Sequence, residues 1–329
     1  MKPCEIAVIV PVHNAAVFLT ACTDAIAAQK FDAFRCILVD DGSTDGSPAL
    51  CDAIAAGDQR FVAMHQPNNG VCAARTAGLR RAQELGARWY AFCDADDLYH
   101  PELLDTLYAA VTNSGLPLAC CRYDTFTDAA PANSAVPSNC KVLRSPAHLD
   151  ALLHDHAVDY GLWNKLFSAD LLTEEMLDNG LAYNEDLLAN WRAFLAAPGF
   201  AYCDFAGYHY RQHAASASHR ALPPQSIDDQ RRAAAEIRAT APDALCESVN
   251  AFYYEKLVYL ASMILRRANA DDYRTQLCEL KVAIAAGEKD PQLGRNPQLP
   301  RSIQLAAFLT LHAPRLWRWA CKNFLKDRQ

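Results

Sequence analysis

An apolar run that ends in three aspartates is the feature that most constrains this chain. Residues 89–93 are mostly apolar and predict a short buried strand, and Asp94, Asp96 and Asp97 follow where that strand ends. In open α/β sheets, ligands bind at the carboxyl ends of the strands. Crowded carboxylates repel one another unless a cation lies between them, and a divalent cation does this well. The pattern predicts a metal site at these three acids; the alternative is a solvated acidic turn.

Strand and helix patterns alternate on either side of this run. Strands are expected at residues 5–10, 35–39, 61–65 and 118–123. Helices are expected after Asn14, which would cap its helix, from Asp45 or Ser47 to Ala56, and at residues 70–85 and 101–114. Such alternation, with short connections between the elements, indicates βαβ units. We therefore expect an α/β fold with a mostly parallel, Rossmann-like sheet flanked by helices. From Pro224 onward the pattern is helical, so we expect a sheet domain at residues 1–220 and a helical region at 221–329.

Composition places the chain among globular proteins. Of its 329 residues, 51% are hydrophobic, and the net charge of −7 gives no reason to expect nucleic acid as a partner. The thirteen cysteines include no Cys-x-x-Cys pair and mostly lie in apolar runs, as Cys36, Cys93 and Cys203 do. This favours free, buried thiols in a reducing cytosol over a disulfide framework. We see no signal peptide and no run of about 18 apolar residues, so a cytoplasmic location is expected.

Polar loops follow three of the predicted strands and should meet at one edge of the sheet. They are residues 11–14, 40–43 and 94–97. Together they offer apolar walls, acceptors for base and ribose groups, and carboxylates for a cation, which is what a nucleotide requires. Neither Gly-x-Gly-x-x-Gly nor the P-loop pattern is present, which argues against a dinucleotide fold or a phosphate-cradling NTPase.

The ordered motifs of this region resemble those of inverting family-2 glycosyltransferases. They are residues 9–14 (Ile-Val-Pro-Val-His-Asn), 39–45 (Val-Asp-Asp-Gly-Ser-Thr-Asp), 68–75 (Asn-Asn-Gly-Val-Cys-Ala-Ala-Arg) and 94–97 (Asp-Ala-Asp-Asp). The resemblance implies a GT-A fold, a nucleotide-sugar donor such as a UDP-sugar, and Mn²⁺ or Mg²⁺ as cofactor. It also implies a donor site within about residues 1–100 and an acceptor side within about 101–220. His13 departs from the pattern, since the family more often has Tyr there.

The resemblance also implies roles at the donor site. Asp41 would accept the uracil N3–H, and Asp94 and Asp96 would hold the ribose and the metal. Arg75 would hold an acid of the strand-end loops or meet a phosphate; a structural salt bridge is the alternative. The donor-binding set is completed by Pro11, Val12 and His13, which would wall the base, and by Asn14 and Ala95.

Glu185 and Asp186 form the second acidic motif, at the predicted start of a helix that runs to Ala197. Acids in the first turn are an ordinary helix-terminus pattern. Inverting transfer, however, needs one carboxylate as a general base and no nucleophilic partner. The resemblance implies that Asp186 is this base and that Glu185 assists it.

A closing segment at residues 208–219 resembles the part of the family that contacts the donor diphosphate. Arg211 suits that contact because a guanidinium can grip phosphate through two N–H groups, and Ser216 would add a hydrogen bond. His219 is a candidate third metal ligand, with an ordinary surface histidine as the alternative. His209 and His213 offer no stronger case.

Residues 301–326 mix aromatic and aliphatic side chains with Arg315, Arg318, Lys322 and Lys326. This suits an anionic membrane surface, although docking on the protein's own core explains the pattern equally well. Pro314 should kink the segment. From the family we expect a glycan or lipid-linked glycan acceptor, reached from the inner face of the cytoplasmic membrane.

Two other classes fit parts of the pattern. A haloacid-dehalogenase-like phosphatase would use Asp94 as nucleophile and Asp96 as acid, although that fold usually begins with its Asp-x-Asp motif. A scaffold that binds a nucleotide sugar without catalysis is the other class.

Overall fold

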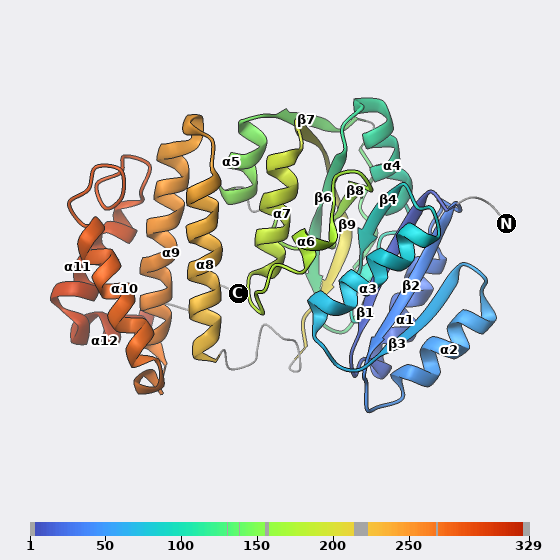
Figure 1. Cartoon of the computed structure of the whole chain (residues 1–329), viewed down its shortest axis with the longest axis horizontal. Coiled ribbons are helices and arrows are strands. Elements are labelled where there is room, and N and C mark those ends of the chain that lie inside the picture. The colour runs from blue at the N-terminus through green and yellow to red at the C-terminus, as the bar shows by residue number, and fades with distance from the viewer. Residues whose placement is uncertain are drawn as a thin grey trace. The chain divides into compact units, whose positions relative to one another are not determined.

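The structure is a computed structural model that describes residues 4–129, 131–137, 139–154, 158–213, 223–267 and 269–324. The chain divides into two compact units, an N-terminal unit of residues 1–214 and a C-terminal unit of residues 215–329, and each is described by itself. The N-terminal unit holds a nine-stranded sheet, and the C-terminal unit is helical (Figure 1).

Four parallel strands form one half of the sheet, in the order β3-β2-β1-β4. Their apolar runs explain this, because parallel strands are covered on both faces. The core side chains of β1 alternate, so Val8 and Val10 join the cluster that includes α1, while Ile9 lies against Gly78 of α3 on the opposite face. This half confirms the predicted βαβ units. Its elements are β1 (Ile6–Val12), α1 (Ala16–Ala27), β2 (Phe34–Asp41), α2 (Ser47–Gly57), β3 (Phe61–Gln66), α3 (Val71–Glu84) and β4 (Trp89–Phe92).

The other half of the sheet is mixed, so the expectation of a mostly parallel sheet holds only as far as β4. Strand β8 is antiparallel to both β4 and β6, and β9 pairs parallel with β6 but antiparallel with β5 and β7. The elements are β5 (Leu98–Tyr99), α4 (Leu103–Ser114), β6 (Leu118–Phe126), β7 (Lys141–Arg144), α5 (Ala147–His154), β8 (Lys165–Ser168), α6 (Glu174–Leu177), α7 (Glu185–Ala196) and β9 (Gly199–Arg211).

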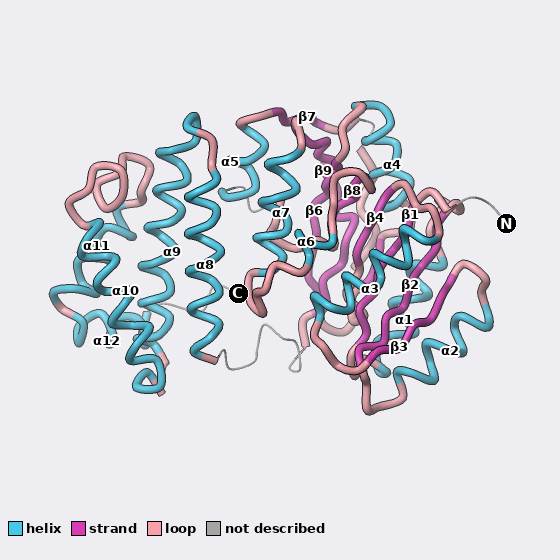
Figure 2. Tube along the Cα trace, in the orientation of Figure 1, coloured by secondary structure: helices cyan, strands magenta, loops and turns pink. Residues whose placement is uncertain are grey.

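The C-terminal unit is built around one long helix, α9. Its core is separate from that of the sheet, and Trp317 of α12 donates its indole N–H to Ser262 Oγ of α9 at 2.9 Å. Figure 2 shows the described residues of this unit as helices and loops. Its elements are α8 (Pro224–Thr240), η2 (Asp243–Leu245), α9 (Cys246–Arg266), η3 (Ala270–Tyr273), α10 (Arg274–Gly287), α11 (Arg301–His312) and α12 (Pro314–Phe324). Pro314 begins α12, so the segment is divided into two helices at the residue where a kink was predicted. Among the described helices, none is long and apolar enough to cross a membrane.

The cysteine prediction needs one correction. Cys203 of β9 is bonded to Cys140, which precedes β7, in a disulfide. The expectation of thiols throughout was wrong here because spacing along the chain does not reveal which strands become neighbours. The other eleven cysteines are free, and most are buried as expected.

Candidate active site

The loops after β1 and β2 are joined by hydrogen bonds at the predicted edge of the sheet. Asn14 Oδ1 accepts the Thr44 N–H at 2.8 Å, and His13 Nδ1 lies 2.9 Å from the Asp41 carbonyl oxygen. Asn14 does not cap the following helix. Its φ of 52° is left-handed, the N-cap is Ala15, and Asp45 from the neighbouring loop accepts the Ala16 N–H at 3.1 Å.

Asp41 is buried and holds the start of α3. Its carboxylate accepts the N–H groups of Asn69 and Gly70 at 2.9 and 2.8 Å and the side-chain amide of Gln66 at 2.8 Å. Its contact with a uracil base stays a prediction. Of the expected base-contacting side chains, His13 is exposed, whereas Val12 is fully buried and packs in the core.

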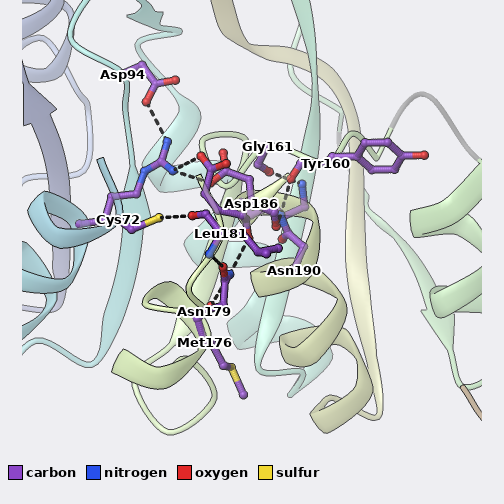
Figure 3. A network of polar contacts seen from close by, with 12 residues as sticks. Cys72, Asp94, Tyr160, Gly161, Met176, Asn179, Leu181, Asp186 and Asn190 are labelled. Carbon is purple, nitrogen blue, oxygen red and sulfur yellow. Dashed lines mark hydrogen bonds and ion pairs between the residues drawn. The ribbon is translucent and has the colours of Figure 1, made fainter. Parts of the chain in front are cut away.

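Arg75 of α3 brings the two acidic motifs together, as Figure 3 shows around Asp94 and Asp186. Its side chain is only 5% exposed. One guanidinium nitrogen lies 3.3 Å from Asp94 Oδ1, and the other lies 3.4 Å from Glu185 Oε1 and also pairs with Asp186. This buried ion pair fits both the role of holding an acid of the strand-end loop and the structural salt bridge that was its alternative, and a contact of Arg75 with a phosphate stays a prediction.

Burial dominates the protonation of this cluster. It raises the pKa of Asp186 to about 8, with Arg75 opposing the shift and Glu185 and Asp94 adding to it. It also raises the pKa values of Asp94 and Glu185, again against the effect of Arg75. For Arg75 itself burial acts to lower the pKa, but the carboxylates reverse this and raise it. The Arg75 guanidinium therefore stays charged, whereas the raised pKa values of the three acids bring them closer to the pH at which they gain and lose protons.

The side chain of Asp97 lies inside the protein, where it stabilises the acidic loop. It is fully buried, and it accepts the Tyr208 hydroxyl at 2.6 Å and the Arg211 N–H at 2.7 Å. Burial and the charges of Asp94 and Asp96 raise its pKa to about 9. The same Tyr208 hydroxyl accepts the Asp94 N–H at 3.1 Å, so Asp97 and Tyr208 together fix the acidic loop on β9.

Asp96 has a partner that the sequence did not single out. His213 Nε2 lies 2.8 Å from its Oδ2. Arg211 donates Nε–H to the Asp96 carbonyl oxygen at 2.8 Å, and its guanidinium lies 5.3 Å from the ring centroid of Phe18 and 4.4 Å from that of Phe126. Arg211 thus lies beside the acidic loop, and its contact with a phosphate stays a prediction.

The donor set at this loop suits a hard divalent cation, because carboxylate oxygens are the ligands that Mn²⁺ and Mg²⁺ take. Asp94 and Asp96 are each about a third exposed, at 31% and 30%. Across the residues that the structure describes, no group of three or more His, Cys, Asp or Glu side chains is placed to hold a metal ion. Ser216 and His219 lie outside the described residues.

Two side-chain amides and a thiol support the second acidic motif, and sequence reasoning missed them. Asn179 donates to the Glu185 carbonyl at 2.9 Å, and Asn190 donates to the Asp186 carbonyl at 3.0 Å. Cys72, one turn before Arg75, donates to the Leu181 carbonyl at 3.7 Å (Figure 3). The helix period places Asn190 one turn beyond Asp186, which was the one available signal.

Residues 7–149 match the family described as glycosyl transferase family 2. A putative glycosyltransferase of Bacillus subtilis, EpsH, is 27% identical over 66% of this chain and 63% of its own length. The uncharacterised glycosyltransferase YibD of Escherichia coli is 24% identical over 97% of this chain and 94% of its own.

Two solved structures resemble the fold. One is S. aureus TarS 1–349 in complex with UDP-GlcNAc, with a TM-score of 0.65 and 17% identity, covering 97% of this chain and 89% of that one. The other is the mannosyltransferase PcManGT of Pyrobaculum calidifontis with GDP-Man and Mn²⁺, with a TM-score of 0.52, 16% identity, and coverage of 98% and 84%.

The sequence matches cover only part of the length of several relatives. The matched stretch spans 63% of EpsH, 30% of GlyA of Streptococcus pneumoniae and 61% of EpsJ of B. subtilis. The family match lies in the sheet unit and contains both the Arg75 helix and the acidic loop. This chain therefore carries a glycosyl transferase family 2 domain.

Proposed function

We propose that this protein is a metal-dependent, inverting glycosyltransferase that takes a sugar from a nucleoside diphosphate, most simply a UDP-sugar, to a hydroxyl acceptor. One observation carries the proposal: buried Arg75 holds the acidic loop after β4 and the acidic start of α7 in one cluster. A donor anchor and a base for the acceptor must lie this close for direct displacement. A phosphatase built on Asp94 has no use for the acids of α7.

Asp186 is the general base in this proposal. Its raised pKa suits proton transfer near neutral pH, and its side chain is 20% exposed, so a hydroxyl can approach it. Glu185 shares Arg75 with it and adds negative charge that keeps Asp186 a better proton acceptor. A single base accounts for inversion, since no carboxylate is needed as a nucleophile.

Asp94 and Asp96 would hold the Mn²⁺ or Mg²⁺, and Tyr208 and Asp97 keep that loop in place. When bound, such an ion neutralises the charge that develops on a diphosphate leaving group. Asp41 is assigned to the base, and Arg211 and Ser216 to the phosphates. The TarS structure in complex with UDP-GlcNAc and the PcManGT structure in complex with GDP-Man and Mn²⁺ support a nucleotide-sugar donor.

The C-terminal unit suggests where the acceptor lies. Helices α11 and α12 expose Leu305, Phe308, Leu316 and Trp319, and Arg315, Arg318 and Lys322 are exposed on the same two helices. We propose that this surface contacts an anionic membrane from the cytoplasmic side, where a lipid-linked glycan would be extended.

The test combines ligand binding with one substitution. Nucleotide sugars, screened by thermal shift with and without Mn²⁺, should raise the melting temperature most with a UDP-sugar plus metal. The Asp186→Asn variant should keep this shift and lose transfer, whereas Asp94→Asn should lose the metal-dependent part of the shift. If no nucleotide sugar stabilises the protein with metal present, the transferase proposal fails. Full turnover in Asp186→Asn with loss only in Asp94→Asn would favour the phosphatase instead.

A further inference from the structure

Lys165 of β8 is a buried ammonium group whose hydrogen bonds go to neutral oxygens. Its side chain is 0% exposed. Nζ donates to the carbonyl oxygens of Val158, Asp159 and Gly161 at 2.9, 3.0 and 2.7 Å, and to Asn164 Oδ1 at 2.7 Å. A buried charge is costly, and an apolar side chain would fill a strand interior at less cost. The lysine therefore needs an explanation other than packing.

The ammonium folds residues 158–161 into a tight turn. Three carbonyls of one short segment converge on it, and Asp159, at a left-handed φ of 54°, accepts the Gly161 N–H at 2.7 Å. Gly161 packs against an indole: a Cβ there would lie 2.2 Å from Trp163 Nε1. The turn is thus held from inside by Lys165 and lies directly on Trp163.

One carbonyl of the turn is used differently. The Tyr160 carbonyl accepts the side-chain N–H of Asn190 at 2.6 Å, and the same amide nitrogen donates to the Asp186 carbonyl at 3.0 Å (Figure 3). Asn190 is fully buried. Its Oδ1 has no partner among the described residues, so these two N–H bonds alone orient the amide. The link runs from Lys165 through the turn to the first turn of α7.

We propose that Lys165 is a positioning residue, which places the Asp186 carboxylate through the turn at residues 158–161 and Asn190. The inference rests on the proposed role of Asp186 as the base. It adds a residue from β8, and a turn between α5 and β8, to a site otherwise built from strand ends, α3 and α7. The charge of Lys165 also contributes, after that of Arg75, to lowering the pKa of Asp186.

The test uses two variants of this link and one matched control. Lys165→Met removes the charge and leaves an unbranched side chain one atom shorter, and Asn190→Leu removes the N–H donors without leaving a buried charge unpaired. Gln29→Met is the control: Gln29 is also buried and binds backbone groups, donating to the His100 carbonyl at 2.8 Å and accepting the Leu104 N–H at 3.0 Å. All three should lower the melting temperature.

We expect kcat to fall 10- to 100-fold in both link variants, because a shift of about 1 Å in a reacting group can cost about 100-fold. The donor KM and the Kd of UDP should stay within twofold of wild type. Gln29→Met should keep kcat. In an Asp186→Asn background, Lys165→Met should cause no further loss, since the group that it positions has been disabled.

The outcomes separate the two proposals. If Asp186→Asn abolishes transfer while folded Lys165→Met and Asn190→Leu keep a wild-type kcat, the positioning role is wrong and the proposed function stands. An equal loss of kcat in Gln29→Met would also overturn it, because destabilisation alone would then explain the effect. If Asp186→Asn transfers at the wild-type rate, the base assignment fails, and the role of Lys165 falls with it.

Discussion

Asp186 is the residue at which burial and charge compete most directly. Burial raises its pKa to about 8, and Arg75 limits the shift. A general base acts only in its ionised form, so activity should fall as the pH drops below that pKa. We expect kcat/KM for the acceptor to decrease about tenfold for each pH unit below 8 and to level off above it, as measured between pH 5.5 and 9.5.

The residual rate of Asp186→Asn is the control for this profile, because without the carboxylate it should vary little with pH. A wild-type profile that is flat from pH 6 to 9 would show that no acid with a raised pKa limits the reaction.

The sequence could suggest roles for Arg75 but could not identify the acids that it contacts. Its acid partner Asp186 lies 111 positions further along the chain, and no local pattern reports on such a contact.

At the scale of the elements, a covalent bond joins β9 to the segment before β7. The Cys140–Cys203 disulfide joins positions 63 residues apart. A cross-link over a loop of this length restricts the unfolded chain, so Cys140→Ser should lower the free energy of unfolding by about 2–4 kcal/mol. Unfolding in urea without reductant measures this, and Cys278→Ser, at an exposed free thiol, should change little.

Alkylation and mass spectrometry give an independent check on the same bond. The denatured protein should take up eleven alkyl groups without reductant and thirteen after reduction. Thirteen groups before reduction would mean that the disulfide does not form.

The elements that the sequence predicted are those that local patterns determine. Strands β1 to β4 are apolar runs between helices. Asp41 ends β2, and Asp94 and Asp96 lie in the loop after β4, as expected. The mixed half was harder, because β5 has two residues and β8 four, too few to show a period. Residues 208–211 belong to β9, a strand of 13 residues, although the sequence suggested only a closing segment. The hydrogen bonds of Lys165 and Asn190 could not be predicted, since no local pattern reports which carbonyl oxygens a side chain will reach.

At the scale of the whole molecule, a net charge of −7 disfavours an anionic membrane, so any binding must come from a local surface. The exposed side chains of α11 and α12 provide one: Leu316 is 55% and Trp319 56% exposed, beside Arg315, Arg318 and Lys322. Each basic residue near an anionic surface contributes about 1 kcal/mol, and salt screens this over about 8 Å. We therefore expect the protein to co-sediment with vesicles of phosphatidylglycerol and phosphatidylcholine, and less so at 0.5 M salt or with phosphatidylcholine alone.

The double variant Leu316→Glu, Trp319→Glu should abolish this binding and leave the thermal shift with UDP-sugar and metal unchanged. Val17→Glu is the matched control, since Val17 is 86% exposed but belongs to α1 in the N-terminal unit. It should bind vesicles like wild type. Equal binding by the double variant and wild type would place the membrane contact elsewhere, and no binding by wild type to anionic vesicles would remove the membrane from the proposal. The exposed apolar side chains of α11 and α12 would then have to be explained by another partner, because monomeric proteins seldom leave a large contiguous apolar surface uncovered.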